Sequence, residues 1–348
     1  MIFHYLDARA IGGIETHVET LALAQIAAGY PAAVILHAGY PDSNVRQRYE
    51  NAGLSVHVAS GTTGLWKLLT RHRPAIIHTH GYKAGINARP IARLLSIPLI
   101  STFHAGERGR GKMAIYQFVD EWTSFAGQRL AVSREIAERM PFETRVIRNF
   151  VPLAPVARRA PEKSRFIFAG RLSHEKGPDI FCWLASRNRQ SGQFDIHGDG
   201  PMRAELEDGY GKNVRFHGFT NNIKAALGEA SALVMTSRNE GLPMIALEAM
   251  AQGVPVIAPA IGGLPELISH GRNGYLFEAA NLASLEDSLH DFCELGRDQI
   301  QAMGSAARHT IASQYSPQAV MPDLLAAYEL AGLKSERSIR TKVQSSAG

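Results

Sequence analysis

Short apolar runs alternate with amphipathic stretches along most of the chain. In the first half, the runs predict strands at residues 2–6, 32–37, 55–59, 75–80, 98–103, 129–132 and 145–147. Between most of them, apolar residues recur with the period of a helix, as at 15–27, 64–72 and 84–95. Strands that alternate with helices in this way predict a doubly wound parallel sheet.

The second half repeats the plan. Strands are expected at residues 165–168, 194–197, 214–216, 233–235 and 254–258, and a helical pattern runs from about 282 to 333. The two halves are joined by a Pro- and Ala-rich stretch, which is typical of an interdomain linker. The expected organisation is an α/β protein with two Rossmann-like domains, divided as 1–150, a linker at 151–163, 164–333 and a polar tail at 334–348.

Composition places the chain among ordinary globular proteins. Its 348 residues suffice for two cores, and contents of 45% hydrophobic and 20% charged residues are usual. No apolar run reaches the roughly 18 residues of a membrane-spanning helix. Residues 1–7 read as a strand rather than a signal peptide. The two cysteines, Cys182 and Cys293, predict no disulfide framework and fit a reducing cytoplasm.

Charge is distributed unevenly. Residues 1–150 hold 17 Lys and Arg against 11 Asp and Glu, or +6, and the remainder holds 20 against 21, or −1. A basic half suits anionic ligands or an anionic membrane surface, with Arg108, Arg110 and Lys112 as a candidate contact, although a solvated basic surface explains it equally well. The basic residues are scattered without interleaved aromatic residues, so nucleic acid is not an expected partner.

One stretch of the second half combines a strand, a polar loop and a helix. An apolar run at 232–235 is followed by Glu240-Gly241-Leu242, which we expect in the loop at the carboxyl end of that strand. Pro243 suits the first turn of a helix, and Glu248 lies one to two turns into it. Parallel sheets bind ligands at this edge, and helix starts favour phosphate. Either glutamate alone is more often a solvated carboxylate.

Another loop of the second half carries two cations. Gly170-Arg171 and Lys176-Gly177 follow an apolar run and precede a helix. Arg binds phosphate through a fork and Lys as a point charge, so this loop is a candidate diphosphate site. Gly198 and Gly218 end neighbouring strands, where turn formation alone would also explain them.

The first half offers glycines and histidines at strand ends. Gly12-Gly13 follow the first strand and open a helix, where the backbone can approach a phosphate. The G-x-G-x-x-G pattern is absent, so a nicotinamide cofactor is not expected. His78, His80 and His104 end apolar strands without nearby carboxylates, which favours the rim of a crevice over a metal site.

These motifs resemble those of a known family. Two glutamates seven residues apart, with Gly-Leu-Pro after the first and Ala-Met-Ala-Gln-Gly-Val-Pro-Val after the second, resemble the donor-site signature of glycosyltransferase family 4. Gly-Arg followed five positions later by Lys-Gly resembles its phosphate motif. Asn149 matches the family residue at the domain crossing, but the Asp expected shortly after it is missing. The resemblance implies the GT-B fold, with two Rossmann-like domains facing across a cleft.

The resemblance also implies a reaction. A retaining, metal-independent enzyme would move a sugar from a nucleoside diphosphate sugar to a hydroxyl of a saccharide or lipid-linked acceptor, in cell-surface glycan biosynthesis. No cofactor and no metal are expected, and the protein would be cytoplasmic, with peripheral attachment to the inner face of the cell membrane. The implied catalytic residues are Arg171, Lys176, Glu240 and His104; the implied donor-binding residues are Gly12, Gly13, Gly170, Gly198, Gly218, Gly241, Leu242, Pro243 and Glu248.

Each main residue has an implied role. Arg171 and Lys176 would stabilise the charge on the leaving diphosphate, and Gly13 would add a backbone N–H. Glu248 would hold the ribose, Glu240 a hydroxyl of the donor sugar, and His104 would face that sugar. Two alternatives remain open: a nucleotide-sugar epimerase on the same fold, and a catalytically silent GT-B subunit of a partner enzyme. The order of the motifs argues against the first, and the intact charged set against the second.

Overall fold

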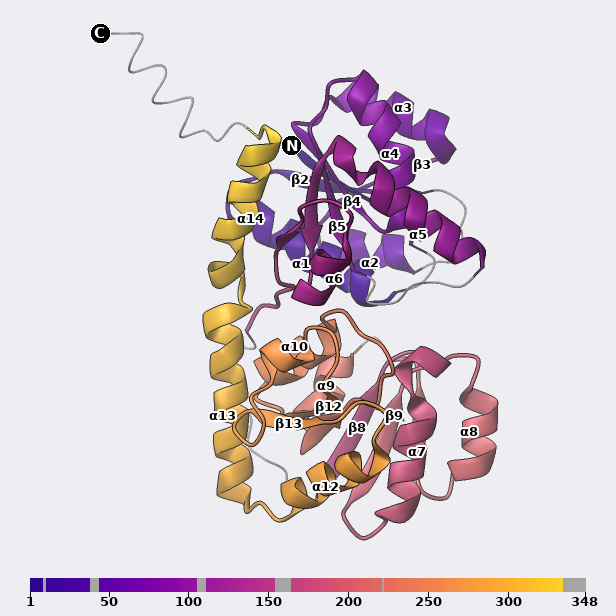
Figure 1. Cartoon of the computed structure of the whole chain (residues 1–348), viewed down its shortest axis with the longest axis vertical. Coiled ribbons are helices and arrows are strands. Elements are labelled where there is room, and N and C mark those ends of the chain that lie inside the picture. Colours follow the sequence, from indigo (N-terminus) through magenta and orange to yellow (C-terminus); the bar gives the residue numbers. More distant parts are fainter. Residues whose placement is uncertain (9–10, 38–43, 105–110, 154–163, 221, 334–348) are drawn as a thin grey trace, which may run out of the picture. The chain divides into compact units, whose positions relative to one another are not determined.

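A computed structural model describes residues 1–8, 11–37, 44–104, 111–153, 164–220 and 222–333 (Figure 1). The chain forms two compact units. The first comprises Met1–Asn149 together with Val320–Gly348, and the second comprises Phe150–Ala319. Arg108, Arg110, most of the expected linker and the expected tail lie outside the described residues.

The first unit contains a parallel seven-stranded sheet in the order β3-β2-β1-β4-β5-β6-β7. Its strands are β1 Ile2–Leu6, β2 Ala32–His37, β3 Ser55–Ala59, β4 Ile76–His80, β5 Leu99–Phe103, β6 Gln128–Ala131 and β7 Arg145–Val146. The helices between them are α1 Gly13–Ala27, α2 Val45–Asn51, α3 Gly61–His72, α4 Tyr82–Leu94, α5 Lys112–Thr123, the 3-10 turn η1 Ser124–Ala126, and α6 Arg134–Arg139.

The second unit contains a parallel six-stranded sheet in the order β10-β9-β8-β11-β12-β13. Its strands are β8 Arg165–Ala169, β9 Gln193–His197, β10 Arg215–Gly218, β11 Ala232–Val234, β12 Val256–Pro259 and β13 Gly274–Phe277. Its helices are η2 His174–Lys176, α7 Pro178–Arg187, α8 Arg203–Tyr210, α9 Ile223–Gly228, α10 Met244–Ala251, α11 Leu264–Leu267, α12 Leu282–Cys293 and α13 Arg297–Gln314; α14 Pro317–Ala331 begins in this unit.

The apolar pattern explains both sheets. Parallel strands with helices on both faces are buried on both sides, which is why β1, β4 and β5 are buried throughout. Every strand expected from the sequence is present, with bounds that agree within two residues, so the prediction of two doubly wound sheets is confirmed. Strand β13 was not predicted from the sequence, because it is short, begins with Gly274 and lies at the sheet edge beside β12.

The end of the chain differs from the expected boundary at residue 333. From Val320 onward, α14 groups with the first unit. There, the Tyr328 hydroxyl accepts a hydrogen bond of 2.7 Å from Gln25 Nε2 on α1 and lies 2.7 Å from His78 Nδ1 on β4. A helical pattern shows that one face is buried but not which core covers it, so this crossing could not be foreseen.

Candidate functional site

The donor-site candidates lie where the strand order of the second sheet reverses. β8 has β9 on one side and β11 on the other, and parallel sheets bind ligands at the carboxyl ends of strands at such a point. The loops that follow β8 and β9 are joined by backbone hydrogen bonds. Gly170 N donates to His197 O at 3.0 Å, and Leu172 N donates to Asp199 O at 2.9 Å.

Glycines allow these loops to approach one another. Gly198 has φ +153°, and a Cβ on it would lie 1.8 Å from Gly170 O. Gly177 has φ +63°, and a Cβ there would lie 2.0 Å from Thr236 O, in the loop after β11. Gly198 N also donates to Gly218 O at 2.8 Å, after β10. The predicted donor-site glycines Gly170, Gly198 and Gly218, which follow β8, β9 and β10, therefore lie together. A side chain at Gly198 would push apart the loops after β8 and β9, and one at Gly177 the loops after β8 and β11.

Two of the predicted catalytic residues are in direct contact. Lys176 Nζ, after β8, donates to Glu240 Oε1 at 2.7 Å and Oε2 at 2.8 Å, after β11. Ser237 Oγ also donates to Glu240 Oε1 at 2.7 Å, and the Glu240 side chain is only 7% exposed. The sequence had indicated separate roles for Lys176 and Glu240 and no role for Ser237. The carboxylate holds the ammonium group in place before any ligand arrives.

Arg238 fastens the loop that carries Lys176. Its guanidinium donates to both Asp179 carboxylate oxygens, at 2.9 and 2.6 Å, and to His174 O at 2.7 Å. Its backbone N–H donates to Glu175 O at 2.8 Å. Arg171, in contrast, is exposed, and its guanidinium makes no hydrogen bond or ion pair within the described part of the chain. One cation of the loop is thus held in position, and the other is available to an anionic ligand.

The predicted loop and helix around the two glutamates are both present. Gly241, Leu242 and Pro243 are buried, and α10 begins directly after them. Gly263 N in the loop after β12 donates to Gly241 O at 2.6 Å, which fixes the turn that presents Glu240. Glu248 is half-buried on α10. The order of strand, polar loop and helix therefore places both carboxylates near the carboxyl edge of the sheet.

The first unit has its own reversal of strand order, between β1 and β4. Gly12 and Gly13 open α1 after β1, and both are exposed. A Cβ on Gly13 would have no described atom within 4 Å. The Gly12 N–H is bonded to the Glu15 carboxylate, so Gly13 is the exposed position at the start of α1, and its part in binding a donor stays a prediction.

The strand-end histidines form a chain of hydrogen bonds. His104 Nε2 lies 3.2 Å from His80 Nδ1, and His80 Nε2 lies 3.1 Å from His4 Nδ1. His4 Nε2 lies 2.7 Å from Gln25 Oε1, which only accepts. His4 must therefore donate to Gln25 and accept from His80, which in turn accepts from His104. The chain thus runs in one direction from His104 into the core, with each ring neutral.

The series of hydrogen bonds continues beyond Gln25. Gln25 Nε2 donates to the Tyr328 hydroxyl, that hydroxyl donates to His78 Nδ1, and His78 Nε2 lies 2.6 Å from Thr102 Oγ1. Donors and acceptors alternate throughout, so this buried polar cluster is satisfied without a charge. His4, Gln25 and Tyr328 were not found from the sequence, because single polar residues within apolar runs carry no signal of which partners they will meet.

Burial keeps these histidines neutral. Desolvation lowers the pKa of His4 to about 4 and that of His104 to about 3, and it lowers the pKa values of His17, His78 and His80 well below the usual range. Neutral imidazole is also the form that binds metal ions.

Two groups within this cluster have ligand atoms within 4.8 Å of one another: His4, His78 and His80, and His17, His80 and His104. Neither group includes a carboxylate, and a metal in the first would take one ring nitrogen from each histidine, so that His4 and His78 would each lose one of their two hydrogen bonds. Metal independence stays a prediction.

Two models of known protein families match this chain. The model described as "Glycosyltransferase Family 4" matches residues 11–155, and the model described as "Glycosyl transferases group 1" matches residues 163–294. The chain belongs to glycosyltransferase family 4. The resemblance stated from the motifs is thereby confirmed.

The curated relatives of this family 4 chain are named for different reactions. It is 27% identical to the glycogen synthase of Mycobacterium tuberculosis, over 94% of this chain and 93% of that protein. It is also 27% identical to an Escherichia coli UDP-Gal:alpha-D-GlcNAc-diphosphoundecaprenol alpha-1,3-galactosyltransferase, over 65% of this chain and 68% of that protein.

Among solved structures, HepE from Anabaena in complex with UDP-glucose matches with a TM-score of 0.80 and 17% identity, over 94% of this chain and 99% of that one. The expected GT-B fold is confirmed.

Proposed function

We propose that this family 4 protein is a retaining glycosyltransferase that moves a sugar from a nucleoside diphosphate sugar to an acceptor hydroxyl. The observation that carries the proposal is the Lys176–Glu240 pair, on loops joined at the reversal point of the second sheet, together with Arg171 in the same loop as Lys176, whose guanidinium has no hydrogen-bond or ion-pair partner among the described residues. Two cations offer the charge that a leaving diphosphate needs, and a carboxylate next to them offers an acceptor for sugar hydroxyls.

The proposed reaction uses these groups in place. The bond between the sugar's anomeric carbon and the phosphate oxygen breaks while the acceptor oxygen forms a bond on the same face, and a phosphate oxygen takes the acceptor's proton. Arg171 and Lys176 stabilise the charge that develops on the diphosphate, together with the backbone N–H of Gly13. Glu248 holds the ribose hydroxyls. We assign no protein nucleophile.

Glu240 and His104 are proposed to handle the donor sugar. Both present acceptor atoms. Lys176 and Ser237 hold the Glu240 carboxylate in position, and desolvation lowers the pKa of His104 so that its imidazole is neutral. A hydroxyl of the sugar would donate to Glu240, which would then share its charge between that hydroxyl and the ammonium group. Lys176 would in exchange gain a phosphate oxygen as a second partner.

The relatives support a choice of donor and acceptor to try first. HepE has been solved with UDP and UDP-glucose, and the galactosyltransferase is named for a UDP-sugar donor and a diphosphoundecaprenol acceptor. We therefore propose a UDP-sugar as donor and a saccharide or lipid-linked saccharide as acceptor, in cell-surface glycan synthesis at the cytoplasmic side of the membrane.

The test begins with thermal shifts against UDP-, GDP- and ADP-sugars. A ligand at 100 times its dissociation constant adds about 2.7 kcal/mol of stability. The best donor is then incubated alone and with saccharide acceptors, and the anomeric configuration of the product is read by NMR. Transfer with the donor's configuration kept is the expected result.

Each alternative gives a different result in the same experiment. An isomerised donor in the absence of acceptor would show an epimerase. Binding without turnover on any acceptor would favour a silent subunit. An inverted product would overturn retention while leaving transfer intact.

A further inference from the structure

Helix α5 has its apolar face turned outward. Ile115, Phe118 and Trp122 follow the i, i+3, i+7 spacing of one helix face, and they are 65%, 58% and 52% exposed. Phe125, in the turn η1 that continues the helix, is 66% exposed. A surface helix of a globular protein normally buries its apolar stripe and exposes polar residues, so this helix has the reverse arrangement.

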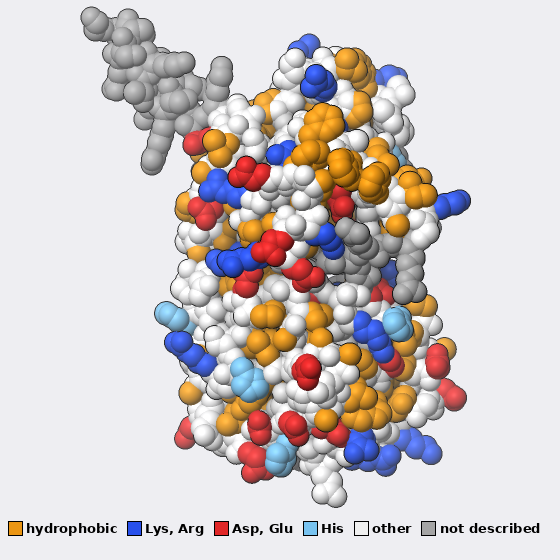
Figure 2. Space-filling view, in the orientation of Figure 1, with side chains coloured by type: hydrophobic (Ala, Val, Ile, Leu, Met, Phe, Trp, Pro, Cys, Tyr) orange, Lys and Arg blue, Asp and Glu red, His pale blue; other side chains and the backbone are white. Residues whose placement is uncertain are grey.

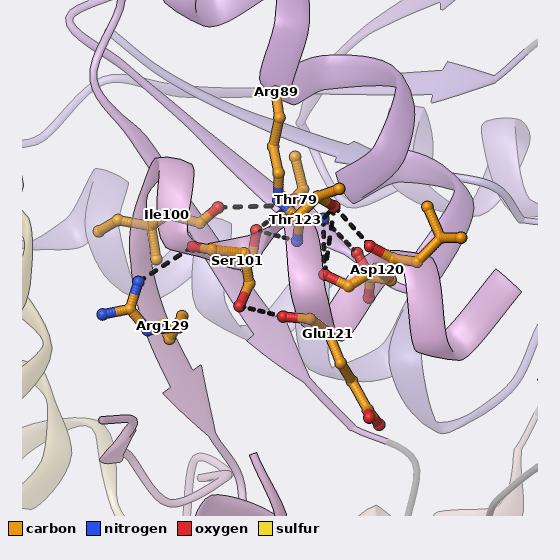
Figure 3. Close-up of polar contacts among 10 residues, drawn as sticks. Thr79, Arg89, Ile100, Ser101, Asp120, Glu121, Thr123 and Arg129 are labelled. Carbon is orange, nitrogen blue, oxygen red and sulfur yellow. Dashed lines mark hydrogen bonds and ion pairs between the residues drawn. The ribbon is translucent and has the colours of Figure 1, made fainter. Parts of the chain in front are cut away.

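Polar contacts hold the inner face of α5. Asp120 and Arg89 of α4 form a buried ion pair of 2.7 Å. Arg89 also donates to Asp120 O at 2.9 Å, to Thr123 Oγ1 at 2.8 Å and to Ser101 Oγ of β5 at 3.0 Å. Figure 3 shows these side chains converging beneath the helix. A Cβ on Gly85 of α4 would lie 2.3 Å from Asp120 Oδ1, so the two helices are in close contact. The apolar face is therefore not needed to hold α5 in place.

The exposed side chains form one surface with a neighbouring segment. Ring centroids lie 5.8 Å apart for Phe118 and Trp122, 6.0 Å for Trp122 and Phe142, and 6.2 Å for Phe125 and Phe142. We call Ile115, Phe118, Trp122, Phe125 and Phe142 the α5 patch. Figure 2 shows hydrophobic side chains gathered over α5. Monomeric proteins seldom leave a large contiguous apolar surface exposed unless it binds something.

We propose that the α5 patch is the surface on which this protein lies on an anionic membrane, with its aromatic side chains between headgroups and acyl chains. Large aromatic and aliphatic side chains, with Trp among them, are typical of proteins that bind at the interface of a bilayer. Within the described ranges no helix is long and apolar enough to cross a membrane, so any contact of these helices with a bilayer would be superficial.

Charge favours the membrane over a second copy of the chain. The half that carries the patch has a net charge of +6. Lys112 is exposed at the start of α5, and the Arg129 guanidinium lies 5.7 Å from the Phe142 ring at the border of the patch. Anionic lipids attract such cations, whereas a symmetric dimer through this face would bring two basic surfaces together.

The test uses the full chain and vesicles in flotation at low salt. Wild-type protein should float with phosphatidylglycerol–phosphatidylcholine vesicles and much less with phosphatidylcholine alone. The double variant Phe118→Ser/Trp122→Ser should bind at least about tenfold more weakly, as expected when two interfacial side chains are lost. Leu330→Ser is the matched control, since Leu330 is 70% exposed on α14 and outside the patch, and it should bind like wild type.

A second measurement reports insertion directly. With Trp66→Phe and Trp183→Phe in place, the emission of Trp122 should shift to the blue on adding phosphatidylglycerol vesicles, and brominated acyl chains should quench it. Transfer to a water-soluble acceptor, measured in parallel, should be unchanged in the double variant. The membrane proposal is thus tested separately from the proposed activity.

Three results would overturn the proposal. One is the absence of wild-type binding to phosphatidylglycerol vesicles at low salt. Another is equal binding by the wild type and the double variant. The third is a dimer in light scattering that becomes monomeric in the double variant, since the patch would then serve a second copy. Circular dichroism of the double variant guards against misfolding, and unaltered melting is expected because both side chains are exposed.

Discussion

The two units share one architecture but place different polar groups at the carboxyl ends of their strands. In the second unit the loops after β8 and β11 carry charges, with Lys176 and Glu240 paired and Arg171 unpaired within the described part of the chain. In the first unit the ends of β4 and β5 carry His80, which is buried, and His104, which is half-buried; desolvation lowers the pKa of both and keeps them neutral. Equivalent edges of the same kind of sheet therefore present charged groups in one unit and neutral ones in the other.

The physical cause of the difference is how each buried polar group finds a partner. The Glu240 carboxylate is paired with an ammonium group 2.7 Å away, and exchanging one partner for a ligand costs little if the ligand is polar. Among the described residues the histidines show no ion pair with a carboxylate, and they satisfy one another through hydrogen bonds. The comparison suggests that phosphate chemistry belongs to the second unit, and that the first contributes uncharged groups suited to hydroxyls.

The largest expected effect is on the cations of the second unit. Arg171→Ala or Lys176→Ala should lower turnover by roughly a hundredfold or more, because a fixed charge next to the leaving group is lost. Lys212→Ala, an exposed cation of the same unit, is the control and should keep wild-type activity. The measurement is the initial rate of transfer, with melting curves to show that folding is intact. Rates within a few-fold of wild type for both variants would contradict the diphosphate site.

A second experiment separates the roles proposed for Glu240 and Glu248. Glu248→Ala should weaken the binding of free nucleoside diphosphate, because ribose contacts are lost. Glu240→Ala should leave that affinity equal or higher, since Lys176 loses the carboxylate that competes with phosphate, yet transfer should fall. Calorimetry with free nucleotide, together with rates, separates the two. Equal losses of affinity in both variants would show that the division of tasks is mistaken.

The hydrogen-bonded histidines of the first unit are tested by replacing His80, which lies between His4 and His104. His80→Phe leaves His4 Nδ1 and His104 Nε2 without partners, and each unsatisfied buried group costs about 1–3 kcal/mol. His309→Phe, an exposed position on α13, is the control and should change stability little. Urea unfolding at pH 7 measures the difference. Equal stability of the two variants would mean that the hydrogen-bonded chain contributes nothing.

The same histidines should make stability depend on pH. Their folded pKa values lie below 6.5, so the unfolded chain binds more protons as pH falls, and stability present above pH 6.5 is lost toward pH 4. Asp120 and Glu15 act in the opposite sense, because burial raises the pKa of Asp120 to about 6 and also raises that of Glu15, so both favour folding as pH falls. The five histidines of the buried cluster outnumber these two carboxyls, so we expect a net loss of stability as pH falls. Unfolding curves from pH 7.5 to 4.5 that show a gain would contradict this balance.

The sequence predicted local features well and distant pairings poorly. Apolar runs located the strands, and Gly-Arg with Lys-Gly located the loop after β8, because each signal lies within one segment. Lys176 and Glu240 are 64 residues apart, and His4 and His80 are 76 apart, so no local pattern indicates that they touch.

Two further features were not predicted from the sequence, for related reasons. The return of α14 to the first unit depends on which core its apolar face meets, and the exposed face of α5 reads in sequence like any buried amphipathic face. In both cases the spacing of apolar residues was visible, but the tertiary packing that decides their surroundings was not.

The smallest expected effect is that of chelation. The chain contains no Asp-x-Asp pair, the arrangement by which many sugar transferases hold a cation against the diphosphate. In the second unit the cations of Arg171 and Lys176 can neutralise the charge that a magnesium ion would otherwise neutralise. In the first unit, His4 and His78 would each have to give up one of their two hydrogen bonds before a metal could bind them. Transfer should therefore survive exhaustive treatment with EDTA, and the purified protein should hold no stoichiometric zinc by elemental analysis. A rate that collapses with EDTA and returns with magnesium or manganese would assign the diphosphate to a metal, and bound zinc with unchanged transfer would assign a structural ion to the histidines.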